Sequence, residues 1–400
     1  MSHAPQAPNA PPDRWDAFAI AAPGLAPLVA AELAAIGITP RETSPAGVAF
    51  DATRADLLAA NLWLRNASRV IVRLDTFEAR DFATLERAAM RVPWSRVMGK
   101  GAAVSLRVTC RKSRLYHSDA VAERVARGIE RTVPGSTMVH GALDDDEAES
   151  SNSTAQRIIV RFDHDRCTIS ADSSGELLHR RGWRQAVAKA PLRETLAAAM
   201  LSACEWDGTV PLVDPFCGSG TIGIEAALRA RNIAPGLERS FAMEHWPGTD
   251  STMVAGARAI ARAAARPATG TTIVMSDRDD GAIAAARANA ERAGVLGDLV
   301  IERRSLSETT LSEVGDHGLL LTNPPYGVRV SDGADLRGLY ARLGDVVRAG
   351  GRGWRLAMLV ADRAVVSSVR LPMDTVLKTS NGGIPVSVEI TRPASVKPKV

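Results

Sequence analysis

Two short polar segments, each placed directly after an apolar run, most constrain the fold of this chain. The first is Asp214-Pro215-Phe216-Cys217-Gly218-Ser219-Gly220-Thr221 after the run 210–213, and the second is Asn323-Pro324-Pro325-Tyr326 after 318–322. Short apolar runs bounded by turn residues are typical of buried strands in a parallel sheet. From residue 191 onward such runs alternate with helical patterns, so the sequence predicts a parallel, doubly wound α/β sheet there.

The two ends of the chain depart from this parallel pattern. Near the C-terminus two β-rich runs flank Asn381-Gly382-Gly383, and an Asn-Gly pair between such runs predicts an antiparallel hairpin. A parallel sheet that ends in a hairpin is not the layout of a plain dinucleotide dehydrogenase. At the other end, residues 15–77 follow the order β-α-β-α-β, and residues 78–173 form a second mixed unit. We therefore expect an α+β module before the α/β domain.

The bulk composition is that of an ordinary globular protein with a slight excess of positive charge. A length of 400 residues predicts roughly two or three domains, and the net charge of +4 weakly favours a polyanionic partner. The four cysteines have no paired spacing, so we expect a reducing compartment, no disulfide framework and no metal site. We find neither a membrane-spanning apolar run nor a signal-peptide core. We expect residues 1–14 to be a disordered tail and the protein to be a cytoplasmic monomer.

The glycine-rich turn after the run 210–213 is suited to a nucleotide-like cofactor. Gly218, Gly220 and Gly223 spell G-x-G-x-x-G, a weak signal of dinucleotide binding that a plain strand-to-helix turn also explains. Asp214 favours another ligand, because a carboxylate here would repel a pyrophosphate but would receive a cationic amine, such as that of a methionine moiety. The segment predicts S-adenosylmethionine, bound by Asp214, Phe216, Cys217, Gly218, Ser219, Gly220 and Thr221.

The next two predicted strands end in residues that suit the rest of such a cofactor. An acid at Asp277 can bind the two hydroxyls of a ribose, with Asp279 as an alternative. The alternative role for one of these two acids is to cap the helix that starts near Gly281. Ser305 follows the third strand, and its position alone places it near the adenine.

The segment Asn323-Pro324-Pro325-Tyr326 has the features needed to hold an exocyclic amine of a base. The side-chain oxygen of Asn323 and the carbonyl of Pro324 are candidate acceptors for the two amine hydrogens. The prolines stiffen the loop, and Tyr326 offers a face on which the base can stack. A rigid turn with a surface tyrosine is the simpler interpretation. Taken together with the glycine-rich segment 214–221, this segment predicts methyl transfer to an exocyclic nitrogen, with Asn323, Pro324, Pro325 and Tyr326 as catalytic residues.

Two basic stretches are candidates for binding nucleic acid. Residues 178–193 contain five Lys or Arg and no acid, and residues 100–131 contain a second cluster. Basic surface gives salt-sensitive affinity for phosphate, although a solvated helix face explains Arg124 and Arg127 equally well. We expect structured RNA to contact Arg111, Lys112, Arg114, Arg180, Arg181 and Arg184.

The chain resembles the THUMP-domain RNA methyltransferases that make N(2)-methylguanosine. The resemblance covers nearly the whole chain after the tail, and it is carried by the segments 23–25, 172–184, 190–198, 214–221, 323–327 and 381–382. It implies a ferredoxin-like segment at 15–77, a THUMP domain at 78–173, a basic linker at 174–190 and a class I methyltransferase domain at 191–400. It also implies that Pro191 and Leu192 lie near the cofactor.

This sequence departs from the family pattern at two positions. Ser305 stands where such enzymes usually carry an acid, and Phe216 stands where a methionine is common. Members act on tRNA or on rRNA, and the single methyltransferase domain does not decide between them. Three other functions remain open: methylation of an adenine amine, an NAD-dependent oxidoreductase reaction, and RNA binding without catalysis.

Overall fold

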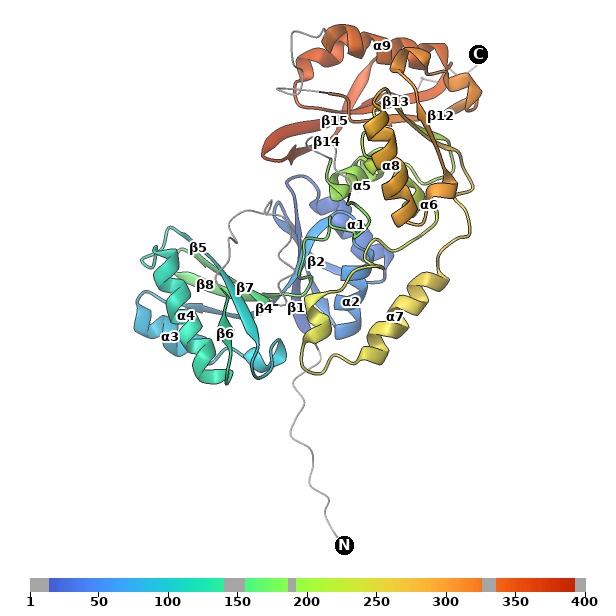
Figure 1. Ribbon diagram of the computed structural model, residues 1–400. Coiled ribbons are helices and arrows are strands. Elements are labelled where there is room, and N and C mark those ends of the chain that lie inside the picture. The colour runs from blue at the N-terminus through green and yellow to red at the C-terminus, as the bar shows by residue number, and fades with distance from the viewer. Residues whose placement is uncertain (1–13, 140–154, 186–191, 326–335, 393–400) are drawn as a thin grey trace, which may run out of the picture.

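The computed structural model describes residues 14–139, 155–185, 192–325 and 336–392, which form two lobes (Figure 1). Each lobe is built around one β-sheet. Three predictions fall outside the described residues: the disordered tail, the contact of Pro191 with the cofactor and the stacking role of Tyr326. In the part of the chain that is described, no helix has the length and apolar character required to cross a bilayer.

The N-terminal module has a single sheet of eight strands in the order β2-β3-β1-β4-β8-β7-β5-β6. Its strands are β1 (Trp15–Ala21), β2 (Pro40–Ser44), β3 (Gly47–Ala52), β4 (Ala67–Glu78), β5 (Ala103–Arg111), β6 (Thr137–Met138), β7 (Gln156–Asp163) and β8 (Arg166–Asp172). The long strand β4 pairs with β1 on one side and with β8 on the other. The predicted ferredoxin-like and THUMP segments therefore share one sheet, and the division between residues 77 and 78 stays a prediction.

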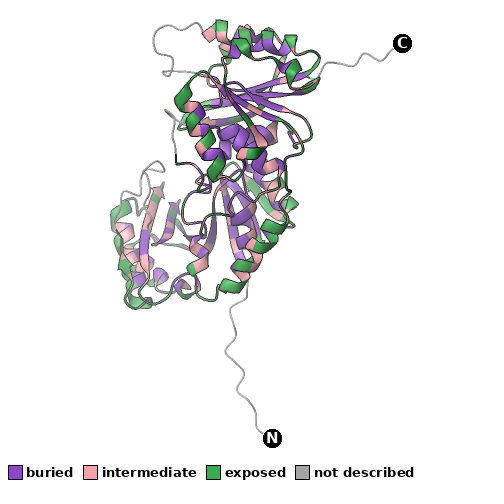
Figure 2. Cartoon of the chain, turned by 45° about the vertical axis from the view of Figure 1, so that its right-hand side comes forward, coloured by how far each residue is buried: buried purple, intermediate pink, exposed green. Residues whose placement is uncertain are grey.

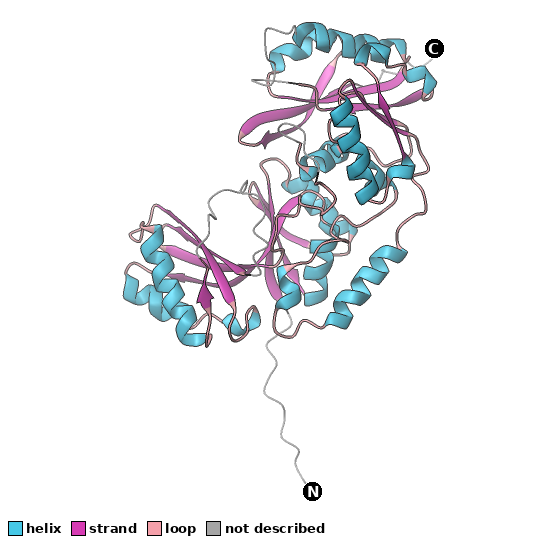
Figure 3. Cartoon of the chain, in the orientation of Figure 1, coloured by secondary structure: helices cyan, strands magenta, loops and turns pink. Residues whose placement is uncertain are grey.

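Four α-helices accompany this sheet in the described part of the module: α1 (Ala26–Ala35), α2 (Arg54–Trp63), α3 (Phe82–Ala89) and α4 (Ser118–Thr132). Helix α2 begins with a capping box, because Thr53 and Asp56 each bond the other's backbone N–H. Val121, Val125 and Ile129 form the buried stripe of α4. Helices α3 and α4 cover the outer face of the β5 half of the sheet, as Figures 1 and 3 show. The opposite face of that half is not covered by these helices.

The C-terminal domain has a seven-stranded sheet in the order β11-β10-β9-β12-β13-β15-β14. Its strands are β9 (Leu212–Asp214), β10 (Ile273–Asp277), β11 (Leu299–Arg303), β12 (His317–Thr322), β13 (Gly353–Val360), β14 (Met373–Asn381) and β15 (Ile384–Thr391). Strands β9 to β13 are parallel, and β14 and β15 add an antiparallel hairpin. The predicted α/β fold with a C-terminal hairpin is therefore confirmed.

Among the residues that the structure describes, this domain has five α-helices: α5 (Glu194–Ala203), α6 (Thr221–Ala230), α7 (Ser251–Ala263), α8 (Asp280–Arg292) and α9 (Leu336–Ala349). From β9 the sheet grows on one side through β10 to β11, whereas β12 lies on the other side of β9. The strand order thus reverses between β9 and β12. In open α/β sheets, ligands bind at the carboxyl ends of the strands beside such a switch point.

The cores of the two lobes are continuous. One cluster of buried side chains runs from Trp15 in β1 to Ile390 in β15, and a second lies between the sheet and α9. Buried residues occupy the strands of both lobes and the helices at their junction (Figure 2). Packing of this kind holds the N-terminal module in a fixed position against the C-terminal domain.

Candidate active site

The two sequence motifs meet at the carboxyl edge of the C-terminal sheet. Asp214 ends β9 and Thr322 ends the neighbouring strand β12. The Thr322 hydroxyl donates a hydrogen bond of 2.6 Å to Asp214 Oδ1, which also accepts one of 3.2 Å from the backbone N–H of Phe216. The switch point therefore joins the glycine-rich turn to the segment that begins at Asn323. Thr322 was not predicted as a site residue, although it directly precedes the Asn-Pro-Pro segment.

Asp214 is a buried acid in an environment that disfavours its charge. Its pKa is raised from 3.8 to about 7, chiefly by burial and to a smaller extent by the nearby Asp277, while the hydrogen bonds from Thr322 and Phe216 oppose the rise. A bound cation next to the carboxylate would offset the free-energy cost of ionising Asp214 in this buried position. The environment fits the predicted role of Asp214 as the receiver of a cationic amine.

The glycine-rich turn leaves room for a ligand at Gly218. This residue has φ of +53°, and a Cβ added there would meet no atom within 4 Å. Its N–H donates to Asp277 Oδ2 at 3.1 Å. Asp279 caps α8 by accepting a bond of 2.7 Å from the N–H of Ala282. Of the two acids at the end of β10, Asp279 is thus the helix cap, and Asp277 faces the turn.

Contacts with α8 and β10 fix the rest of the turn. Asn289 on α8 donates to the carbonyl of Ser219 at 3.0 Å. The N–H of Cys217, a buried residue, donates to the carbonyl of Ser276 at 3.0 Å. Phe216 is half-buried and packs against the core beneath α9. Gly220 ends the turn with φ of +88° as the N-terminal cap of α6. These contacts preorganise the turn.

Ser305 lies at the predicted edge of the site but makes a local structural contact. It follows β11, whose neighbour β10 ends at Asp277, and the N–H of Arg304 donates to the carbonyl of Asp277 at 3.0 Å. The hydroxyl and N–H of Ser305 both donate to Glu308, at 2.7 and 2.8 Å. The pair caps the short helix η4 (Leu306–Glu308). An acid is therefore present in this loop three residues after Ser305.

Asn323 presents an acceptor that has no partner among the described residues. Its Oδ1 atom is buried and accepts no hydrogen bond, although the side chain as a whole is half-buried. Pro324 is buried and Pro325 is half-buried. A buried polar atom without a partner costs free energy, so its presence points to a ligand that completes it.

Two predicted RNA contacts in the linker are structural instead. Arg181 is 3% exposed, and its Nε lies 3.2 Å from Glu225 Oε1 on α6. Arg184 reaches Glu194 on α5 at 2.9 Å and donates to Thr221 Oγ1 and the Leu192 carbonyl at 2.7 and 2.6 Å. The prediction that these two arginines lie on an RNA-binding surface is corrected, because both guanidinium groups are engaged inside the protein. Leu192 is buried beside them and connected to the turn through Arg184.

The second basic cluster is on the surface, as expected. Arg111, Lys112 and Arg114 are exposed between β5 and α4. Tyr116 follows them with 69% of its surface exposed, and its ring lies 4.1 Å from that of His117, centroid to centroid. Arg180 is half-buried and lies 3.8 Å from Glu176. Sequence reasoning did not select Tyr116, which is the exposed aromatic of this cluster.

The fold and the carboxyl-edge site define a class I methyltransferase. Comparison with known families agrees: the family described as "RMKL-like, methyltransferase domain" matches residues 181–389, and the "RlmL ferredoxin-like domain" matches residues 16–71. The chain therefore belongs to the RMKL-like methyltransferase family. The alternative of an NAD-dependent oxidoreductase is wrong.

Individual relatives span most of this chain. A putative RNA methyltransferase of Synechocystis sp. is 32% identical over 375 residues, covering 93% of this chain and 95% of the relative. The ribosomal RNA large subunit methyltransferase K/L of Syntrophotalea carbinolica is 34% identical over 378 residues, covering 92% of this chain and 52% of the relative. This chain thus spans about half the length of that protein. A crystal structure titled a putative methyltransferase complexed with SAH has a TM-score of 0.84 at 26% identity, covering 96% of this chain and 100% of its own.

The cofactor of the chain is S-adenosylmethionine, of which SAH is the demethylated product. The residues present fit this group. Asp214 is a buried acid without a cationic partner among the described residues, and Gly218 leaves open space above the turn. Asp277 provides carboxylate oxygens beside that space. We assign the methionine amine to Asp214 and the ribose to Asp277 as proposals.

Proposed function

We propose that this protein methylates the exocyclic N2 of a guanosine in tRNA or rRNA. The observation that carries the proposal is the buried, unbonded Oδ1 of Asn323 at the switch point. An exocyclic amine is the donor that such an acceptor lacks. The names of the relatives, which are RNA methyltransferases, support RNA as the carrier of the target base.

The chemistry assigned to the chain is mainly positioning. S-adenosylmethionine supplies an electrophilic methyl group when bound. Asn323 Oδ1 and the carbonyl of Pro324 accept hydrogen bonds from the two amine hydrogens, which turns the nitrogen lone pair toward the cofactor side. The methylated nitrogen then loses one proton to solvent, which leaves a neutral product. Through its hydrogen bond of 2.6 Å to Asp214, Thr322 fixes the position of that acid relative to the Asn-Pro-Pro segment. Placement of reacting atoms can account for about 7–11 kcal/mol of a barrier, so no strong base is required.

A target base inside structured RNA has to leave its stack to reach this edge. The protein then needs a separate surface that holds the RNA. The exposed Arg111, Lys112 and Arg114 supply positive charge, and Tyr116 supplies an aromatic face on the same segment. Basic residues next to an exposed aromatic are the combination that binds unpaired nucleotides. We propose this segment as one RNA anchor.

The test is methyl transfer from labelled S-adenosylmethionine to separated tRNA and rRNA from cells that lack the protein, followed by nucleoside analysis. Labelled N(2)-methylguanosine in one fraction is the expected result. Label in methyladenosine would replace guanine by adenine as the target. No label in either fraction, with cofactor binding intact, would overturn the proposal in favour of RNA binding without catalysis.

The matched variant is Asn323→Ala. Because Oδ1 accepts no hydrogen bond from the described protein, its removal should leave folding and the dissociation constant for S-adenosylmethionine nearly unchanged. Removing one such positioned group typically lowers kcat by about 10²–10³. Single-turnover rates and calorimetric titration of the cofactor measure the two quantities. An unchanged rate would exclude Asn323 from catalysis.

A further inference from the structure

Arg184 of the linker lies where three segments meet beside the cofactor turn (residues 214–221). Its Nη2 atom donates to the Thr221 hydroxyl at 2.7 Å and to the Leu192 carbonyl at 2.6 Å. Its Nε atom lies 2.9 Å from Glu194 Oε1, and only 12% of its side chain is exposed. A single guanidinium group thus contacts the start of α6, the start of α5 and the chain that enters α5.

These contacts depend on the shape of an arginine. A guanidinium group presents five N–H donors in one plane, so it can bond several acceptors at once, whereas lysine carries all its donors on one nitrogen. Glu194 is buried, and its pKa is raised from 4.5 to about 7, chiefly by burial, while Arg184 opposes the rise. The arginine therefore compensates a buried acid and bonds two neutral acceptors at the same time.

The next linker residue contacts the same turn from the side of α8. The backbone N–H of Gln185 donates to Asn289 Oδ1 at 3.4 Å. The side-chain nitrogen of Asn289 in turn donates to the Ser219 carbonyl at 3.0 Å. Ser219 and Thr221 lie two residues apart in the cofactor turn. Both are therefore held by hydrogen bonds that lead to consecutive residues of the linker.

The other end of the linker is bonded to the N-terminal module. The N–H of Leu178 donates to the carbonyl of Ser68 on β4 at 2.9 Å. Arg181 Nη2 donates to the carbonyl of Arg65, just before β4, at 2.7 Å. The linker thus runs from the central strand of the module to the cofactor turn and is hydrogen-bonded at both ends. A linker fixed in this way can position the residues that it contacts.

The cofactor turn needs such contacts because its backbone is intrinsically free. Gly218 and Gly220 have φ of +53° and +88°, and glycine populates many other conformations when nothing restrains it. Ordering a loop at the moment of binding lowers the affinity for the ligand, and a loop that is already ordered avoids this cost. The bonds from Arg184 and Asn289 restrain the turn in the absence of a ligand. They should therefore raise the affinity for the cofactor.

We propose that Arg184 is a positioning residue of the cofactor site, which holds the cofactor turn, through the Thr221 hydroxyl, in the conformation that binds S-adenosylmethionine. Arg184 acts through Thr221 and does not touch the reacting atoms. The inference rests on the proposed placement of the cofactor at this turn. It gives Arg184 a function in place of the predicted contact with RNA, for which its guanidinium group is not accessible.

The test compares the dissociation constant for S-adenosylmethionine, from calorimetric titration, with the melting temperature of the full chain. Arg184→Met should lower both the affinity and the melting temperature, because it also leaves Glu194 buried without its partner. Arg184→Met combined with Glu194→Gln removes both charges, so most of the lost melting temperature should return. The affinity should stay about tenfold below that of the wild type, a factor typical of residues in one hydrogen-bond network. Recovery of the affinity together with the melting temperature would overturn the proposal.

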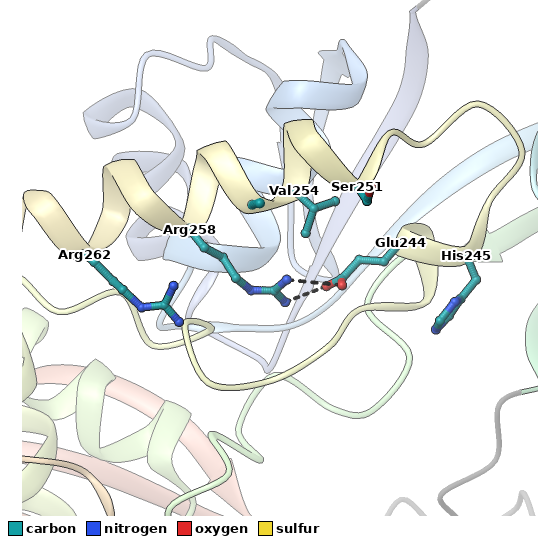
Figure 4. Close-up of a pocket in the computed structure, with 7 residues that line it drawn as sticks. Glu244, His245, Ser251, Val254, Arg258 and Arg262 are labelled. Carbon is teal, nitrogen blue, oxygen red and sulfur yellow. Dashed lines mark hydrogen bonds and ion pairs between the residues drawn. The ribbon is translucent and has the colours of Figure 1, made fainter.

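A similar arginine on α7, shown in Figure 4, provides the matched control. Arg258 lies 2.7 Å from Glu244, donates to the Arg239 carbonyl at 2.6 Å and has 17% of its side chain exposed. It repeats the contacts of Arg184 with an acid and a carbonyl, but it makes no hydrogen bond or ion pair with the described cofactor turn. Arg258→Met with Glu244→Gln should leave the affinity for the cofactor unchanged. An equal decrease in affinity in this control would overturn the proposal.

The route through the Thr221 hydroxyl is tested by a double-mutant cycle. Thr221→Val removes the acceptor and should weaken cofactor binding, whereas Thr221→Ser keeps the hydroxyl and should bind like the wild type. Arg184→Lys keeps the charge opposite Glu194 but loses the planar group, so it should also weaken binding. In the Thr221→Val protein, Arg184→Lys should have little further effect, because the bond between the two residues is already absent. Additive losses would show that Arg184 does not act through Thr221 and would overturn the proposal.

These outcomes are independent of the proposed methyl transfer, because the titrations contain no RNA. A protein that shows the expected cofactor affinities but labels no RNA would retain the role of Arg184 and lose the proposed function. A protein that makes N(2)-methylguanosine, and whose Arg184→Met, Glu194→Gln variant has the wild-type KM for S-adenosylmethionine, would retain the function and lose the role of Arg184.

Discussion

Asp214 combines complete burial with neighbours that cannot neutralise it. A hydroxyl, a backbone amide and a second acid surround its carboxyl group. Because its pKa rises from 3.8 in the unfolded chain to about 7 in the folded protein, the ligand-free protein holds the proton more tightly than the unfolded chain does. The stability that this proton contributes is complete below pH 3.8 and is lost as the pH rises through about 7. Cofactor binding would add a positive charge beside Asp214 and would therefore favour its ionised form over its protonated form.

The pH dependence of cofactor binding tests this role of Asp214. As the pH falls below about 7, a cationic ligand has to displace a proton, so the affinity for S-adenosylmethionine should drop by up to about tenfold per pH unit. Asp214→Asn keeps the shape and removes the charge, so it should bind weakly at every pH and show a flat profile. Calorimetric titrations in buffers of different ionisation enthalpy measure the affinity and the proton count. A wild-type profile that stays flat below pH 7 would contradict the assignment.

At the scale of the element, Gly223 allows helix α6 to pack closely against the sheet. A Cβ at Gly223 would lie 2.1 Å from Met275 Sδ and 2.5 Å from Met275 Cγ, and Met275 is fully buried in β10. The third glycine of the G-x-G-x-x-G pattern thus permits close packing between helix and strand. Its position is separate from the ligand-facing position of Gly218.

Gly223→Ala should therefore destabilise the protein by about 1–3 kcal/mol, as overpacking of a core typically does. Gly256 in α7 is the control, because a Cβ there would meet no atom within 4 Å. Gly256→Ala should stabilise by about 0.5–1 kcal/mol through the lower entropy of the unfolded chain. Urea denaturation of both variants gives the comparison. Equal effects of the two substitutions would show that α6 does not require close packing at Gly223.

The elements that sequence reasoning predicted are those with strong burial patterns. Strand β7 has such a pattern, because the buried Ile158, Val160 and Phe162 alternate with less buried residues. Strand β2 was missed, since its residues Pro-Arg-Glu-Thr-Ser lie at the sheet edge and none is buried. An exposed edge strand carries no alternation to detect. Helix α7 was also missed, in a region where no element was predicted.

The site shows the same limit. Local patterns located the glycine turn and Asn323 at the ends of the buried strands β9 and β12, and the roles of these residues stay predictions. The burial of Arg181 was not predictable, since its partner Glu225 lies in a distant helix and the neighbouring sequence is uniformly basic.

At the scale of the whole molecule, three distant segments meet in one buried ionic cluster. Arg65 precedes β4 in the N-terminal module, Arg181 lies in the linker and Glu225 lies on α6. Arg181 Nη2 donates to the Arg65 carbonyl at 2.7 Å, and its Nε lies 3.2 Å from Glu225 Oε1. Glu225 also lies 3.8 Å from Arg65 Nη1. The cluster connects the module that would hold RNA to the helix that follows the cofactor turn.

Removing one member of this cluster should affect both lobes together. Arg181→Met leaves Glu225 buried and less compensated, and breaking a buried ion pair from one side costs about 3–5 kcal/mol of stability. The exposed pair of Arg262 and Glu238 is the control, where Arg262→Gln should cost no more than about 1 kcal/mol. Calorimetric unfolding measures both variants. Because the core is continuous between the lobes, we expect the Arg181→Met protein to unfold in one transition at a lower temperature. Two separate transitions, with that of the C-terminal domain unshifted, would show that the cluster does not couple the lobes.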